Sequence, residues 1–221
     1  MVTRNAEDYL LSIYMLTQDG SAAKTTDIAA RMKVSPASVT EMVKRLSDEG
    51  LVSYERYRGA RLTERGSRHA RKLRRKHCLL EKFLVDVLGM KRDVGHEEAC
   101  RLEHVMSDES VSKICQLMNN PAECPKGEEI PPCVEICALC DKEPSTSMAD
   151  LIEGEEGTIT HLICERPGKV RKLISMGFVP GRKVTIEQVL PLGGPLLIRL
   201  EGTKIALARE FASLVHVKRE A

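Results

Sequence analysis

The sequence predicts a multidomain α+β protein with three successive folded regions in 221 residues. In the first region, apolar residues at helical spacing precede two short strand-like runs, which predicts a winged helix-turn-helix. Helical periodicity then continues to about residue 118, which predicts an all-α region. From residue 148 onward short apolar runs alternate with Gly and Pro, as in a small β-barrel. The length supports this division, because a typical domain has about 100–150 residues.

The helices of the first region each have a start signal. Apolar residues recur at helical spacing over 5–18, and a second helix is expected to begin near Thr26, a residue type that caps helices. Ser35 is predicted to cap a third helix, with Pro36 in its first turn and Gly50 closing it. These helices form the expected helix-turn-helix.

The third helix and the hairpin after it carry the predicted DNA contacts. Strands are expected at 51–57 and 60–63, with residues 58–59 at the tip of the wing. Small residues let a helix lie deep in the major groove, whereas basic residues contact phosphate. The hydroxyl-bearing residues could alternatively be ordinary exposed residues of the helix without a role in DNA binding. The predicted contact residues are Ser35, Ala37, Ser38, Thr40, Lys44, Arg56 and Arg58.

Charge is unevenly distributed along the chain. Residues 1–76 contain 16 Lys and Arg against 9 Asp and Glu, whereas the remainder contains 18 against 23. A basic block at one end of an otherwise acidic chain suggests a polyanion such as double-stranded DNA as a partner. Charge alone would equally fit a solvated helix surface.

The middle of the chain is expected to be helical. A long helix is predicted over 64–89, a second over 95–106, and a third that Ser107 caps and that stops at 119–121. The apolar stripes of 77–89 and 108–118 are the expected dimerisation surface. There is no signal-peptide pattern and no apolar run long enough to cross a membrane. We therefore expect a cytoplasmic protein without membrane association, with its cysteines reduced.

Metal-type ligands mark the second of these helices. Imidazole, thiolate and carboxylate groups bind first-row divalent metals, and at a 3.6-residue period one helix would show them all to one side. Two more, His77 and Glu81, are one turn apart on the preceding helix. Each alone would more simply be an ordinary surface residue, but the set predicts a metal. The residues on the second helix are His96, Cys100, Glu103 and His104.

With these elements in order, the chain resembles the diphtheria toxin repressor (DtxR/MntR/IdeR) family of metal-dependent transcriptional regulators over nearly all of its length. Residues 35–44, 75–81 and 96–109 carry the resemblance, and the last part is similar to a FeoA-like SH3-type domain over 173–181, 191–196 and 205–207. The resemblance implies four segments. They are a winged helix-turn-helix DNA-binding domain at 1–73, a helical metal-binding and dimerisation domain at 74–120, a Cys/Pro-rich linker at 121–147 and an SH3-like β-barrel at 148–221.

The resemblance also implies a function and two metal sites. A homodimer would bind palindromic operators and repress metal-uptake genes, with no catalytic residue and no small-molecule substrate. A ligand on the first helix would tie the DNA-reading domain to the dimerisation domain only when metal is bound. The regulatory site would comprise Asp8, Cys100, Glu103 and His104. The ancillary site would comprise His77, Glu81 and His96.

The identity of the metal depends on an unusual pair of residues. Iron-responsive relatives typically have methionine at the position of Asp8 and cysteine at that of Cys100, whereas manganese-responsive relatives have aspartate and glutamate. A thiolate shifts preference toward Fe(II), so we predict Fe(2+), with Mn(2+) as the alternative. In the iron type the barrel adds a Glu and a Gln to the ancillary site. The aligned positions here, near Arg166 and Lys169, cannot bind metal.

Four cysteines in the linker form a second candidate site. Their spacing fits a tetrahedral Zn(2+) or an iron–sulfur cluster, and a redox-reactive loop or unligated cysteines are the alternatives. A cysteine-cluster or redox-sensing regulator is accordingly a second hypothesis for the function. A metalloenzyme or metal carrier is a third, but no base or nucleophile arrangement accompanies the metal residues. The four residues are Cys124, Cys133, Cys137 and Cys140.

Overall fold

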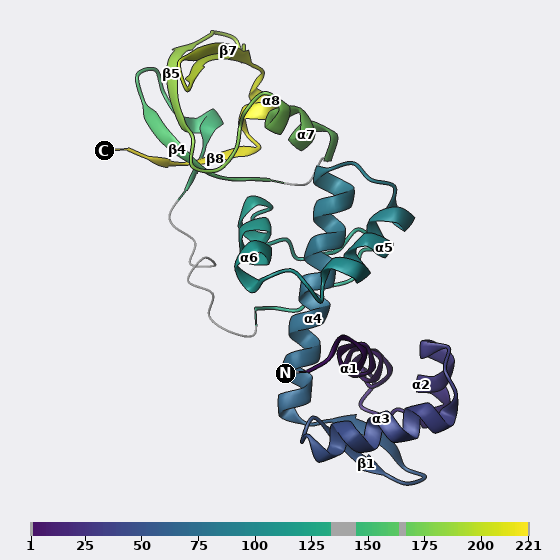
Figure 1. Cartoon of the computed structure of the whole chain (residues 1–221). Coiled ribbons are helices and arrows are strands. Elements are labelled where there is room, and N and C mark those ends of the chain that lie inside the picture. The colour runs from purple at the N-terminus through teal and green to yellow at the C-terminus, as the bar shows by residue number, and fades with distance from the viewer. Residues whose placement is uncertain (1, 134–144, 164–166, 221) are drawn as a thin grey trace. The chain divides into compact units, whose positions relative to one another are not determined.

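The computed structural model describes residues 2–133, 145–163 and 167–220 (Figure 1). The chain divides into two compact units. Unit 1 contains Met1–His77, Glu103–Val105 and the segment that begins at Pro131, and unit 2 contains Cys78–Leu102, Met106–Ile130 and the C-terminal region. The short stretch Glu103–Val105 therefore groups with the N-terminal elements of unit 1, whereas the helices on either side of it group with unit 2.

Unit 1 contains the predicted winged helix-turn-helix. Its elements are α1 (Arg4–Leu16), α2 (Thr25–Met32), α3 (Pro36–Asp48), β1 (Val52–Glu55), β2 (Gly59–Leu62) and the N-terminal part of α4 (Glu64–Lys82). Ser35 caps α3 as predicted, since its Oγ accepts a hydrogen bond from the Ser38 amide at 3.1 Å. The capping role expected of Thr26 was wrong, because α2 starts at Thr25 after Lys24, whose side chain makes no capping bond. Ala23 pairs with Ala60 of the wing two residues before α2 begins.

The core of unit 1 packs the three N-terminal helices together. Leu10 and Ile13 of α1 and Val43 of α3 are completely buried. The N-terminal end of α4 lies so close to the loop before β1 that a Cβ on Gly66 would be 2.0 Å from the Leu51 carbonyl oxygen. Glycine at this position therefore sets the approach of α4, the helix that carries His77 and Glu81 into the metal region.

The helical part of unit 2 differs from expectation at two places. The long helix predicted over 64–89 is α-helical only to Lys82 and continues as one π-helical turn, η1 (Phe83–Val87), in which the Leu88 amide bonds to the Phe83 carbonyl. The helix predicted over 95–106 is α5 (Arg92–Leu102), so Glu103 and His104 lie in the turn after it. Their side chains bond to residues of α1 and α4 within unit 1, directly after α5 has ended at Leu102. Ser107 then caps α6 (Asp108–Leu117) as predicted.

The C-terminal part of unit 2 is the SH3-like barrel. Its elements are β3 (Thr146–Ser147), η2 (Met148–Asp150), β4 (Glu156–Leu162), α7 (Pro167–Ser175), β5 (Lys183–Val189), β6 (Leu196–Leu200), β7 (Thr203–Leu207), α8 (Arg209–Ala212) and β8 (Val215–Arg219). The antiparallel strands follow the order β3-β8-β4-β5-β6-β7. Register shifts in β4 and β5 act as bulges that let the sheet curve. The Gly and Pro pattern predicted the strands but not α7 or α8.

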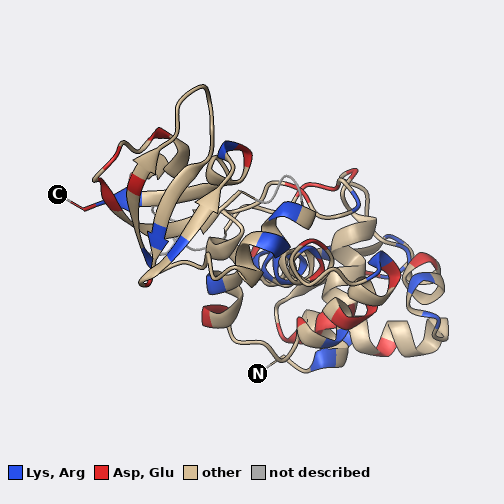
Figure 2. Ribbon diagram, turned by 90° about the horizontal axis from the view of Figure 1, so that it is seen from above, with Lys and Arg blue, Asp and Glu red and all other residues tan. Residues whose placement is uncertain are grey.

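The barrel encloses an apolar core around Phe178, which is completely buried, and its exterior carries residues of both charge signs (Figure 2). Among the described helices, none has both the length and the apolar composition that crossing a bilayer requires.

Candidate metal centre

Three of the predicted ligands come together within unit 1. Asp8 lies on α1, and Glu103 and His104 lie in the turn after α5; their ligand atoms are all within 4.8 Å of one another. His104 Nε2 is 3.0 Å from Asp8 Oδ1 and 3.3 Å from Glu103 Oε1. The side chains of Glu103 and His104 are each 3% exposed and that of Asp8 is 38% exposed. Two carboxylates and an imidazole nitrogen thus lie close together, and Asp8 is the most exposed of the three residues.

The charges around this point suit a divalent cation. Burial raises the pKa of Asp8 and the neighbouring Glu103 carboxylate raises it further, against the opposing effects of His104 and Arg4. Two like charges held together at low exposure are unfavourable unless a cation neutralises them. Oxygen and imidazole donors are suitable ligands for first-row divalent metals. These residues therefore fit the metal that the sequence predicts.

A second hydrogen bond links the two predicted ligand sets. His77 Nδ1 lies 2.6 Å from Glu103 Oε2, and both side chains are 3% exposed. Glu103 thus has one oxygen directed toward His104 and the other toward His77 of α4. The orientation of Glu103 is fixed from both sides, as is usual for a carboxylate ligand supported by neighbouring hydrogen bonds.

The other predicted ligands cluster within unit 2. Glu81 is buried, and its Oε1 lies 3.3 Å from His96 Nδ1. Cys100 Sγ lies 3.9 Å from His96 Nε2, one turn along α5. Lys126 was not among the predicted residues, yet its Nζ is 3.7 Å from the same Glu81 oxygen and 3.2 Å from His96 Nδ1. Its ammonium group supplies positive charge to a buried carboxylate. No sequence pattern marks this lysine, because its segment has no periodicity.

Two further polar residues beside the metal centre were missed. Glu7 Oε2 lies 2.7 Å from His104 Nδ1, and Glu7 Oε1 lies 2.9 Å from His69 Nε2 on α4. Glu7 lies in the first turn of α1, where an acidic residue is common because it interacts favourably with the helix dipole. The sequence therefore gives no reason to assign it a role at the metal centre. His69 belongs to a basic run without metal-ligand spacing. Only the folded chain brings Glu7 to His104 and His69 to Glu7.

The predicted DNA contacts lie on α3, at its cap and on the wing. All are exposed except Thr40, which is half-buried and donates its hydroxyl to the Pro36 carbonyl at 2.9 Å. On the wing, Arg58 pairs with Glu55 at 3.0 Å, and the Arg56 guanidinium lies 4.9 Å from the centre of the Tyr57 ring. Such exposed pairs are weak and can exchange for phosphate contacts.

The additional cysteines have different surroundings. Cys124 is 4% exposed and packs in an apolar cluster with Cys78 and Cys115. Cys133 is exposed. Cys137 and Cys140 lie outside the described residues, and so does Arg166, one of the two barrel positions considered for the ancillary site.

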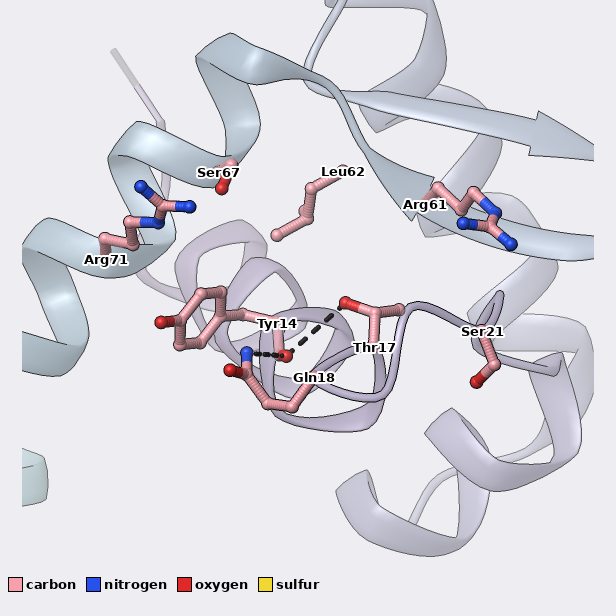
Figure 3. Close-up of a pocket in the computed structure, with 8 residues that line it drawn as sticks. All are labelled: Tyr14, Thr17, Gln18, Ser21, Arg61, Leu62, Ser67 and Arg71. Carbon is pink, nitrogen blue, oxygen red and sulfur yellow. Dashed lines mark hydrogen bonds between the residues drawn. The ribbon is translucent and has the colours of Figure 1, made fainter. Parts of the chain in front are cut away.

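A polar pocket of about 330 Å³ lies between the C-terminal end of α1, the wing and α4 (Figure 3). Ser67 and Arg71 of α4 face Tyr14 of α1 and Gln18 of the turn after it across the pocket, and the Gln18 amide donates to the Tyr14 carbonyl at 2.7 Å. The pocket contains no imidazole, thiolate or carboxylate, so it is unsuited to a transition metal.

Three family models match the chain in succession. They are "Iron dependent repressor, N-terminal DNA binding domain" at 1–60, "Iron dependent repressor, metal binding and dimerisation domain" at 63–132, and "FeoA domain" at 146–219. The iron-dependent repressor IdeR of Mycobacterium tuberculosis is 32% identical over 224 residues, covering 96% of each chain. The chain belongs to the diphtheria toxin repressor family of metal-dependent transcriptional repressors. The diphtheria toxin repressor of Corynebacterium glutamicum is 30% identical over 96% of this chain and 95% of its own.

Solved structures of this repressor family agree with the assignment. A manganese-dependent transcriptional repressor in complex with manganese has 26% identity and a TM-score of 0.53, and covers 97% of this chain and 100% of its own. ScaR with bound Zn2+ has 30% identity and a TM-score of 0.53, covering 98% and 100%. The resemblance stated from the sequence is confirmed, and so is the fold class. These relatives are named for iron or manganese or were solved with zinc, so membership of the family does not by itself specify one metal.

Proposed function

We propose that the protein is an Fe(II)-activated repressor of metal-uptake genes that binds palindromic operators as a homodimer in the cytoplasm. The observation that carries the proposal is the position of Asp8. It lies on α1 of the winged domain, yet its carboxylate is 3.0 Å from His104 in the turn that continues α5. A regulatory ligand on the DNA-reading part of the chain makes the conformation of that part depend on the metal.

The mechanism follows from what these side chains do with and without a cation. Asp8 and Glu103 repel each other, and burial makes the charge on Asp8 unfavourable. A bound divalent ion supplies the positive charge that lets both carboxylates remain ionised side by side. Asp8, Glu103 and His104 then hold α1 against the 103–105 turn, and α3 is carried with α1 because the two share one core. Operator affinity rises to the extent that this arrangement is the one that fits DNA.

Cys100 is the basis for proposing iron. The resemblance assigns it to the regulatory site, and a thiolate favours Fe(II) over the oxygen-preferring Mn(II). Asp8 favours the alternative, a Mn(II)-responsive regulator, since it is an oxygen donor and solved relatives are named for manganese. A regulator controlled by Cys124, Cys133, Cys137 and Cys140 through Zn(2+) or an iron–sulfur cluster is the remaining alternative.

DNA binding and dimerisation are proposed on separate features. The exposed small residues of α3, with Lys44, suit the major groove, and Arg56 and Arg58 suit phosphate. In unit 2, Leu88 and Val94 are large apolar residues that are 56% and 43% exposed, and they lie in the region matched by the metal-binding and dimerisation model. Such exposure is expected where a second subunit packs. A two-fold dimer would read an inverted repeat.

The test is an anaerobic titration of Fe(II) and Mn(II) against promoter fragments, read by fluorescence anisotropy. The native protein should respond at lower Fe(II) than Mn(II), and Cys100→Glu should shift the ratio of the two responses toward Mn(II), because it exchanges a soft ligand for a hard one. An unchanged ratio would contradict the iron assignment. Replacing all four linker cysteines by serine should leave the Fe(II) response intact; its loss would favour the cysteine-cluster alternative.

A further inference from the structure

Glu7 connects three parts of unit 1 through two histidines. It lies on α1 next to Asp8, and its carboxylate is 2.9 Å from His69 Nε2 on α4 and 2.7 Å from His104 Nδ1 in the turn after α5. The Glu7 side chain is only 18% exposed and that of His104 only 3%. Both oxygens of one half-buried carboxylate are therefore used to hold imidazole rings.

The chemistry of the carboxylate decides how the His104 ring must be arranged. Both ring nitrogens face carboxylates, but a nitrogen that binds a cation carries no proton. When Nε2 is the metal ligand, Nδ1 is therefore the nitrogen that carries the proton, and the Glu7 carboxylate can only accept a hydrogen bond from it. His104 thus donates Nδ1–H to Glu7, and its Nε2 faces Asp8 and Glu103. This is the arrangement in which a metal-binding histidine donates its second N–H to a carboxylate, which fixes the ring and raises its basicity.

We propose that Glu7 is a positioning residue for the metal centre and that His69 holds Glu7 in place. The inference rests on the proposed metal site, because it assigns His104 Nε2 to the cation. A glutamate side chain loses considerable rotamer freedom when it is fixed, and a donor on each oxygen lets this one be fixed before metal arrives. Metal affinity then depends on a histidine of α4 that is not itself a ligand.

The first experiment measures Co(II) binding to the full-length metal-free protein by the absorption of the Co(II) centre. The relevant transition is the one that Asp8→Ala abolishes. Glu7→Ala should weaken that transition's affinity by about 10- to 100-fold, the usual effect of removing a supporting hydrogen bond from a metal ligand. His69→Ala should weaken it by about fivefold, as expected for a bond worth about 1 kcal/mol.

A conservative variant and two controls separate positioning from general damage. His69→Gln retains an N–H that can donate to Glu7, so it should restore most of the affinity lost in His69→Ala. Glu41→Ala removes an exposed carboxylate from α3, and Ser67→Ala removes a polar group from the same helix as His69, beside the pocket (Figure 3). Both controls should bind Co(II) as the native protein does.

The second experiment examines the ring without metal. In protein with 15N-labelled histidine, the Nδ1–H of His104 should give a hydrogen-bonded signal that His69→Gln retains and Glu7→Ala loses. Native Co(II) affinity in both Glu7→Ala and His69→Ala, or a His104 Nδ1 without a proton, would overturn the inference. If the native protein showed no Asp8-dependent Co(II) transition, the proposed metal site would fail instead, and the imidazole signal would still decide whether Glu7 orients His104.

Discussion

The centre of unit 1 and the core of the barrel are built on opposite principles. The barrel is built around a large cluster of buried apolar side chains, with Phe178 at full burial. The metal centre of unit 1 instead brings ionisable side chains together, with those of Glu103 and His104 buried and that of Asp8 partly exposed. Burial of apolar surface stabilises the barrel without any ligand. In the metal centre of unit 1, neighbouring carboxylates need a cation to neutralise them, so the conformation of this region depends on whether metal is bound.

Among the variants that test this difference between the two regions, the largest loss of stability is expected from a substitution in the barrel core. Phe178→Ala removes a completely buried aromatic ring and should lower the free energy of unfolding of the barrel by about 3–5 kcal/mol. Hydrogen exchange resolved by segment would show faster exchange in β4 to β8. The loss should be the same with and without metal. A loss that excess Fe(II) repaired would show that the barrel also depends on the cation.

Metal removal should have the complementary effect. With free metal at about 100 times its dissociation constant, binding stabilises the folded state by about 2.7 kcal/mol, and a chelator removes that contribution. Exchange should therefore quicken in α1 and the 103–105 turn and stay unchanged in β5 and β6. Equal changes in the two regions would contradict the division between a conditional centre and a self-sufficient barrel.

The smallest expected effect is a dependence of the stability of the barrel on pH. His216 stacks on His161 with ring centres 4.6 Å apart, and burial lowers the pKa of His216 despite the opposing charge of Asp150. The unfolded chain therefore binds the proton more readily than the folded one. The resulting stability is present above the ordinary value of 6.5 and is lost as the pH falls through the lowered pKa. His216→Gln should make the unfolding midpoint of the barrel less sensitive to pH between 7 and 5; equal sensitivity would exclude His216 as its source.

The sequence predicted most elements because their signals are local. The cap at Ser35, the apolar spacing of α1 and the Gly and Pro pattern of the barrel each concern neighbouring residues. Errors arose where distant contacts decide the outcome. Ala23 pairs with Ala60 just before the start of α2, and the bonds of Glu103 and His104 to α4 and α1 coincide with the end of α5 at Leu102.

The candidate site was predicted to a similar degree and for the same reason. Glu103 and His104 were identified from their spacing and Asp8 from the resemblance, and the fold brings their ligand atoms together. Cys100, predicted for the same site, lies beside His96 in unit 2. Glu7, His69 and Lys126 were missed, because a supporting residue needs only one suitable donor or acceptor and has no characteristic spacing. Metal ligands can be predicted from their spacing in the sequence, whereas the residues that hold the ligands in place are identified only once the fold is known.

The most direct test is operator occupancy by a protein in which Asp8, Glu103 and His104 are all replaced by alanine. In the native protein, excess ferrous salt should raise promoter affinity over that in chelator by about 5- to 150-fold, the usual range of coupling between two sites. In the triple variant, with a folded barrel verified by its hydrogen exchange, that difference should disappear. A variant that still bound the promoter more tightly in ferrous salt than in chelator, by the native factor, would contradict the account.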